Sequence, residues 1–280
     1  MPKNTNEFFI HNNKAHAINE LQTFHELYRK KYYYEVIRII EGVPLFFKDH
    51  MKRFKQSIEI SGDYFEFTFE EIKNGIKQLI EINNIKNANL KIIITIGKNH
   101  RDFFVQKVPH YYPTNEEYKH GIKTNTWLHE RYHPTAKVWD NAYKQKIKQL
   151  KSDLNVFEIL LLNEKGQITE GSITNFFYIK GNKLFTAPKY LVLPGITRKH
   201  VLKCCKNLGI KVKFKPLKQK NLTKIDAAFI TGTSSNVLPV SSINDYKIDV
   251  NHSMLLAITE DLNKKIRKYI EKRKSNTLSN

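Results

Sequence analysis

Two short apolar runs constrain the fold of this chain more than any other feature of its sequence. Residues 90–96 and 156–162 are dominated by Leu, Ile, Val and Phe, and a turn sequence at 163–166 closes the second run. Runs of this length are typical of strands buried in a core, whereas a membrane-spanning helix needs about 18 apolar residues or more. A chain of 280 residues can bury such strands in one large domain or two smaller ones.

The first half of the chain predicts a small α+β unit. Its strand patterns alternate and are rich in β-branched residues, and Asp49 can cap a helix. The predicted strands are 33–40, 43–47, 90–96 and 103–108, and the predicted helices are 69–83 and one beginning at Asp49.

The second half of the chain has a different pattern of elements, with more predicted strands and tighter turns. Residues 109–117 carry two prolines and no apolar periodicity, so they are the best linker candidate. We therefore predict two domains, residues 1–116 and 117–280. In the second domain the predicted strands are 121–128, 156–162, 175–179, 183–186 and 227–231, and the predicted helices are 139–150, 197–209 and 253–269.

The net charge of +20 invites a nucleic-acid interpretation. The lysines are spread along the whole chain, however, and we find no helix-turn-helix, zinc-finger or aromatic-basic RNA-binding signature. We expect no nucleic-acid partner and no membrane association, and an anionic substrate would also benefit from a positive field. The only cysteines, Cys204 and Cys205, are adjacent and poorly placed for a structural disulfide, which favours a cytoplasmic location.

Two side chains suggest covalent chemistry. Lys137 is a candidate Schiff-base lysine, which must be unprotonated to attack an aldehyde. Glu170, in Glu-Gly-Ser-Ile-Thr-Asn, is a candidate carboxylate partner for a pyridine nitrogen. Taken singly, Lys137 is better explained as a solvated surface lysine, and Glu170 as a capping or turn glutamate.

Two segments could hold an anion. Residues 195–197 precede a predicted helix, whose first amides carry the positive end of the helix dipole. Residues 231–234 follow a predicted strand and offer a second group of amides and hydroxyls. An ordinary N-cap and a polar turn are the alternatives. With Lys137 and Glu170, these cups suit an enzyme that uses pyridoxal 5′-phosphate (PLP), and no metal site is predicted.

The order of these motifs resembles the class IV aminotransferases, the fold-type IV group of PLP enzymes. This group holds branched-chain aminotransferases, D-amino acid aminotransferases and 4-amino-4-deoxychorismate lyases. The resemblance extends from about Tyr33 to about Asn244. It rests on Arg131-x-x-Pro134-x-x-Lys137, Glu170-Gly171-Ser172-x-x-Asn175, Leu193-Pro194-Gly195-Ile196-Thr197-Arg198 and Thr231-Gly232-Thr233, with Tyr34-Glu35-Val36-Ile37-Arg38 and His50-x-x-Arg53 upstream.

The resemblance implies an α+β fold with a small α/β N-terminal domain and a larger pseudo-barrel C-terminal domain, assembled as a homodimer. It implies that Lys137 is the catalytic lysine and that Glu170 binds the pyridine nitrogen. The implied phosphate-binding residues are Arg53, Ile196, Thr197 and Thr233. Tyr34 and Arg38 would face the substrate, and His100 or Arg101 would bind its carboxylate.

The implied reaction is transamination between an amino acid and a 2-oxo acid. The short length of the chain and the missing branched-chain pattern leave 4-amino-4-deoxychorismate lyase open as the alternative. Two departures from the family pattern stand in the sequence. Residues 29–32 replace a common Gly-Asp-Gly, and Tyr143 is offset from the tyrosine that follows the lysine in branched-chain enzymes.

Overall fold

The computed structural model describes residues 7–25, 32–96, 101–131, 135 and 141–278. The chain divides into two compact units. The first contains Met1–His110 and Arg267–Asn280, and the second contains Tyr111–Thr135 and Asp140–Ile266. The division predicted between residues 116 and 117 stays a prediction. Lys137 and His100 lie outside the described residues.

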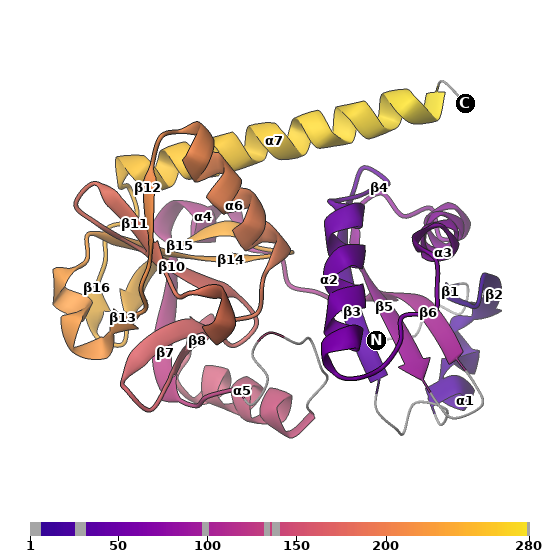
Figure 1. Ribbon diagram of the computed structural model, residues 1–280, viewed down its shortest axis with the longest axis horizontal. Coiled ribbons are helices and arrows are strands. Elements are labelled where there is room, and N and C mark those ends of the chain that lie inside the picture. The colour runs from indigo at the N-terminus through magenta and orange to yellow at the C-terminus, as the bar shows by residue number, and fades with distance from the viewer. Residues whose placement is uncertain (1–6, 26–31, 97–100, 132–134, 136–140, 279–280) are drawn as a thin grey trace. The chain divides into compact units, whose positions relative to one another are not determined.

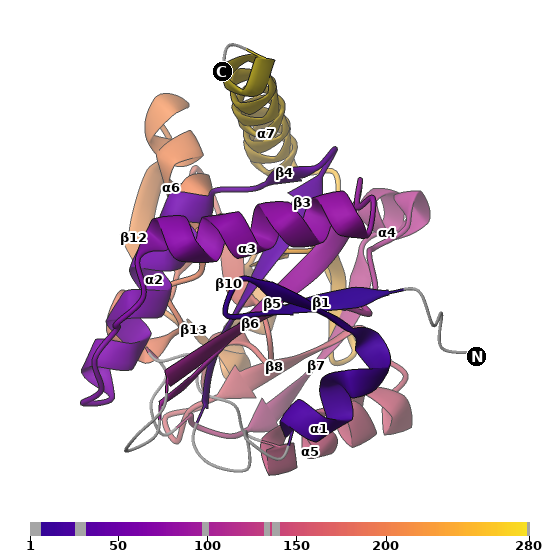
Figure 2. The same cartoon turned by 90° about the vertical axis from the view of Figure 1, so that its right-hand side faces the viewer.

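The first unit is built on one layer of strands with helices packed on it (Figure 1). The strand order is β2-β1-β6-β5-β3-β4, and each neighbouring pair is antiparallel. Helix α2 contacts β3, and α3 contacts β1 and β6 (Figure 2). The strands are β1 Phe8–His11, β2 Lys14–Ala17, β3 Tyr32–Ile40, β4 Val43–Pro44, β5 Ala88–Ile96 and β6 Arg101–Val108, and the helices are α1 Leu21–His25, α2 Phe47–Ile60 and α3 Phe69–Ile82, with a 3-10 turn η1 at Ile18–Glu20.

Alternation along β3 separates the two faces of this sheet. Tyr33, Ile37 and Ile39 are buried and join the main core of the unit beneath α2 and α3. Tyr34 and Arg38 occupy the opposite face and are half-buried. The predicted strand at 33–40 and the predicted helix at 69–83 are confirmed to within one residue at each end.

The predicted return strand at 43–47 is wrong beyond Pro44. Strand β4 covers only Val43–Pro44, and Phe46 takes a left-handed conformation with φ of 51°. Helix α2 begins at the next residue, Phe47, two residues before the expected cap at Asp49. Phe46 is buried in this conformation, and a positive φ interrupts a strand.

The second unit contains a ten-stranded sheet with both parallel and antiparallel pairs. Its order is β12-β11-β10-β14-β15-β7-β8-β9-β13, with β16 paired to β15. The strands are β7 Ile122–Leu128, β8 Glu158–Leu162, β9 Gln167–Gly171, β10 Asn175–Lys180, β11 Lys183–Thr186, β12 Lys211–Phe214, β13 Leu217–Lys218, β14 Ala227–Gly232, β15 Asn236–Ile243 and β16 Tyr246–Lys247. The helices are α4 Asn115–His120, α5 Asn141–Asp153 and α6 Ile196–Asn207, with 3-10 turns η3 Lys189–Leu191 and η4 Gln219–Lys224. Helix α7, Ser253–Leu278, belongs to this unit up to Ile266, and its residues from Arg267 onward belong to the first unit.

This sheet curls round its own core. The hydrogen-bonded path runs from β10 through β14, β15, β7 and β8 to β9, and the chain itself returns from β9 to β10 through residues 172–174. One apolar cluster draws side chains from all six of these strands, including Ile122, Leu160, Ile168, Phe176 and Leu238. The turn at 172–174 therefore closes the ring of strands. The residues on either side of it, Gly171 at the end of β9 and Asn175 at the start of β10, are held in the sheet.

Helices of the second unit differ from expectation mainly at their ends. Helix α4 begins at Asn115, inside the segment predicted to be a linker, because Thr114 and Glu117 form a capping box. Helix α6 ends before Gly209, whose φ of 68° suits a helix terminus. Cys204 and Cys205 are buried in α6 and are free thiols. Of the helices that the structure describes, none combines the length and apolar character needed to cross a membrane.

Candidate active site

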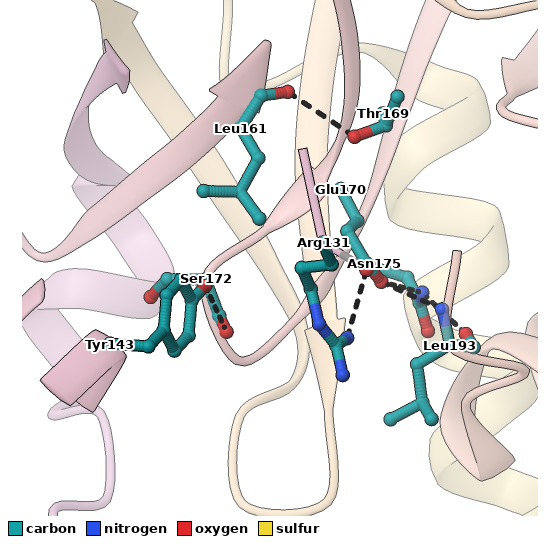
Figure 3. A network of polar contacts seen from close by, with 8 residues as sticks. All are labelled: Arg131, Tyr143, Leu161, Thr169, Glu170, Ser172, Asn175 and Leu193. Carbon is teal, nitrogen blue, oxygen red and sulfur yellow. Dashed lines mark hydrogen bonds and ion pairs between the residues drawn. The ribbon is translucent and has the colours of Figure 1, made fainter. Parts of the chain in front are cut away.

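Glu170 lies in β9, directly before the turn that closes the ring of strands. Its side chain is almost fully buried, with 2% of the residue exposed. Three nitrogen donors converge on its carboxylate (Figure 3). Arg131 Nη1 donates to Oε1 at 3.0 Å, the Leu193 amide donates to Oε2 at 3.0 Å, and Asn175 Nδ2 reaches Oε2 at 3.3 Å. The alternative of a solvated turn glutamate is therefore excluded.

Burial and hydrogen bonding act on this carboxylate in opposite directions. Burial raises the pKa of Glu170 to about 7 from an ordinary value of 4.5. The charge of Arg131, the Leu193 amide and the charge of Arg198 each lower that pKa and only partly offset the burial. The ionised carboxylate is the form that can accept a hydrogen bond from a ring N–H.

Asn175 connects Glu170 to the start of α6. Its Nδ2 donates to the Leu193 carbonyl at 2.9 Å as well as reaching Glu170. A Cβ built on Gly195, the N-cap of α6, would lie 2.0 Å from Asn175 Oδ1. Only glycine fits at residue 195 with Asn175 in this position, so the carboxylate and the helix start form one packed assembly.

The two predicted anion cups both lie in this unit. Ile196 and Thr197 are the first two residues of α6, both buried, and no described side chain caps that helix. Thr233 lies in the turn between β14 and β15 and is half-buried. Thr231 pairs with Asn175 across the sheet, and its Oγ1 is buried without a hydrogen-bond partner among the described residues.

These residues fit a phosphorylated pyridine cofactor. The uncapped helix start offers amides to an anion, and the buried Thr231 hydroxyl is a polar atom that a bound group could satisfy. The carboxylate of Glu170 offers an acceptor to a ring N–H. The donor set therefore has a place for the negative end and for the basic ring nitrogen of such a molecule.

The remaining predicted residues belong to the first unit. Arg53 is buried on α2 and donates through Nε to Glu35 Oε2 at 3.0 Å, and its Nη2 also binds Glu35. His50 Nδ1 lies 3.1 Å from the same carboxylate. Arg101 begins β6, is exposed and forms an ion pair with Glu66. Tyr34 and Arg38 share one face of β3, as their spacing predicts.

Four contributors to the site were not assigned a role from the sequence: Arg131, Asn175, the Leu193 backbone and Arg198. All four stand in the recognised motifs, so their residue types were visible although their contacts were not. Arg198 is buried and donates Nη2 to the Ala187 carbonyl at 2.8 Å. The offset Tyr143 donates its hydroxyl to the Ser172 carbonyl at 3.0 Å, so it binds the turn beside Glu170 (Figure 3).

Comparisons with known proteins show the family of this chain. The family model for amino-transferase class IV matches residues 33–243. A D-alanine aminotransferase from Bacillus licheniformis is 30% identical over 230 residues, which cover 77% of this chain and 80% of that protein.

Solved structures share the fold. A branched-chain amino acid aminotransferase of T.th., solved with pyridoxamine 5′-phosphate, has a TM-score of 0.79 at 24% identity, covering 91% of this chain and 92% of that one. A Legionella pneumophila protein provisionally described as a 4-amino-4-deoxychorismate lyase has a TM-score of 0.75 at 22% identity, covering 85% and 92%. The predicted fold type and the prediction of an enzyme are confirmed, and the chain belongs to the class IV aminotransferases.

Proposed function

We propose that this protein is a PLP-dependent aminotransferase that exchanges an amino group between an amino acid and a 2-oxo acid, of the branched-chain or D-amino acid type. The observation that carries the proposal is the buried Glu170 carboxylate, held by three nitrogen donors beside an uncapped helix start. When bound, PLP supplies an electron sink for cleavage of a substrate Cα–H bond.

Each proposed role follows from the chemistry of its residue. Glu170 keeps a proton on the ring nitrogen, and Arg131 and Asn175 hold Glu170 in place. Lys137 binds the cofactor and moves the proton at the substrate Cα. The phosphate is bound by the α6 amides at Ile196 and Thr197, by Thr233 and by Arg53. Tyr34, Arg38, His100 and Arg101 are proposed to contact the substrate.

The relatives support the substrate class in two ways. One relative acts on D-alanine by its name, and a solved neighbour is a branched-chain enzyme. The second candidate, release of pyruvate and 4-aminobenzoate from aminodeoxychorismate, is favoured by the likeness to the Legionella protein and by the departures at residues 29–32 and Tyr143.

The test is a visible spectrum of the protein purified with PLP, before and after the addition of a panel of L- and D-amino acids. We expect a yellow band that bleaches with one class of donor and returns when a 2-oxo acid is added. A band that no donor bleaches, together with turnover of aminodeoxychorismate, would support the lyase. Absence of any band, with salt-sensitive binding of DNA or RNA, would support the nucleic-acid alternative instead.

We further propose a cytoplasmic homodimer. Family membership supports the dimer, and two adjacent free cysteines suit a reducing compartment. Light scattering coupled to size-exclusion chromatography should give twice the mass of one 33.0 kDa chain, whereas the mass of a single chain would contradict the dimer.

A further inference from the structure

A second buried carboxylate lies behind the turn that follows Glu170. Glu158 is the first residue of β8 and has no exposed surface. It belongs to none of the motifs that identified the family. A buried charge is costly unless it is paired and hydrogen-bonded, so its partners indicate what it does.

The two oxygens of Glu158 bind the two hydroxyls of the turn. Ser172 Oγ donates to Oε1 at 2.5 Å, and Thr174 Oγ1 donates to Oε2 at 2.9 Å. The residue between them, Ile173, points outward and is 64% exposed. One carboxylate therefore binds both sides of a three-residue turn and leaves its tip in solvent.

The charge on Glu158 is compensated from behind the turn. Lys151 Nζ on α5 lies 3.1 Å from Oε1, and the Ile159 amide donates to the same oxygen at 2.9 Å. Oε1 therefore contacts Lys151, the Ile159 amide and Ser172, while Oε2 accepts from Thr174. Glu158 is therefore a fixed anchor rather than a second acid in the site.

The turn is packed too tightly on Glu158 to shift freely. A Cβ built on Gly171 would lie 2.1 Å from Thr174 Oγ1 and 3.1 Å from Glu158 Oε2. The Ser172 amide donates to the Ile159 carbonyl at 2.8 Å, and the Gly171 amide donates to the Thr174 carbonyl at 2.8 Å. Glu170 and Asn175 immediately flank this turn, so its position sets theirs.

We propose that Glu158 is a positioning residue: through Ser172 and Thr174 it fixes the turn that aligns Glu170 and Asn175 with the pyridine ring of the cofactor. The part that concerns the cofactor rests on the proposed function, whereas the anchoring of the turn does not. Glu158 itself touches neither cofactor nor substrate in this assignment.

The experiment compares Glu158→Ala, Glu158→Gln, the paired variant Ser172→Ala/Thr174→Val, and the triple combination with Glu158→Ala. Glu164→Ala, an exposed glutamate in the β8–β9 turn, is the matched control. Two readouts are taken on the full chain. One is hydrogen–deuterium exchange of peptides covering 170–175 without cofactor, and the other is the dissociation constant for PLP.

We expect Glu158→Ala to speed exchange at 170–175 while leaving peptides of α3 unchanged, and to weaken PLP binding about tenfold, the scale of one lost buried hydrogen bond. Glu158→Gln should keep most of the slow exchange at 170–175 and most of the PLP affinity, because an amide can still bind both hydroxyls. The paired hydroxyl variant should reproduce the effect, and adding Glu158→Ala to it should change nothing more.

Three results would overturn the proposal. They are wild-type exchange and affinity in Glu158→Ala, wild-type exchange and affinity in the paired hydroxyl variant, or full additivity in the triple variant. If Glu158→Ala does not fold, the hydroxyl variant alone decides. If the wild-type protein binds no PLP, the proposed function fails, while the exchange measurement still tests the anchoring of the turn.

Discussion

At the scale of single residues, two opposing effects act on the Glu170 carboxylate: its burial and the hydrogen bonds that it accepts. Its carboxylate is removed from water, which favours the neutral acid, yet three N–H donors face it, which favours the anion. Burial prevails and the pKa rises to about 7. A cationic ring N–H would supply the missing compensation, so we expect the site to be more stable with its cofactor than without it.

The raised pKa of Glu170 predicts that the free energy of unfolding depends on pH. Between the ordinary pKa of 4.5 and the native pKa of about 7, the folded protein binds the proton more tightly than the unfolded chain does, so the Glu170 contribution to stability falls as pH rises. The Glu170→Gln variant carries no ionisable group there. In urea unfolding without cofactor, its stability relative to wild type should rise by up to about 3 kcal/mol from pH 5 to pH 8.

Glu164→Gln is the control for this measurement, because Glu164 is exposed in the adjoining turn. Its stability relative to wild type should stay constant over the same range. A Glu170→Gln variant that behaved like this control would show that the carboxylate is not held in a raised-pKa environment.

Gly195 offers a second prediction at this scale. Its backbone, with φ of −59°, suits alanine, but the added methyl would lie 2.0 Å from Asn175 Oδ1. Gly195→Ala should therefore cost about 1–3 kcal/mol of stability, the range for overpacking, and should weaken PLP binding. Calorimetry in an Asn175→Ala background should find most of this stability cost gone. An equal cost in both backgrounds would mean that Asn175 does not impose the glycine.

At the scale of elements, sequence periodicity predicted the helices and strands that pack one face against a core. β3, α3, β10 and β11 fall within two residues of their expected bounds, because each alternates or repeats against a single core. Strand β15 was missed because Pro239 argues against a central strand. It lies between β14 and β7, with Pro239 opposite Phe229 of β14, and its register with β7 shifts between Val240 and Ser242.

Several short strands were also missed. β1, β2 and β12 are four residues long, and β13 and β16 only two, which is too short for a strand period to stand out. β11 is equally short but was predicted because a turn joins it to β10 as a hairpin. The candidate site shows the same limit. Its side-chain types stand in the motifs, but the Leu193 amide reaches Glu170 only through the path of the backbone.

The start of α3 gives an element-scale prediction. Thr68 Oγ1 accepts from the Glu71 amide at 3.1 Å, and Glu71 Oε2 accepts from the Thr68 amide at 2.7 Å. Thr68→Ala should lower the free energy of unfolding by about 1 kcal/mol. Urea unfolding should show a lower midpoint at an unchanged slope. The exposed Thr223 is the control, and an equal loss in Thr223→Ala would contradict a specific capping effect.

At the scale of the whole molecule, the chain combines a small sheet covered by two helices with a curled sheet that carries Glu170 and both anion cups. The lysines and arginines behind the charge of +20 are spread along the sequence of both units. The same fold serves a branched-chain aminotransferase and a protein described as a lyase, so fold alone does not name the reaction. The chemistry must be read from the site.

The most direct test of this account asks which lysine carries the cofactor. The protein loaded with PLP is reduced with borohydride, which fixes the cofactor to its lysine, then digested and analysed by mass spectrometry. The chain is rich in lysine, so a specific result is informative. We predict one modified peptide, with the added mass on Lys137, and none in Lys137→Arg. Labelling of a different lysine, or of many equally, would contradict the assignment.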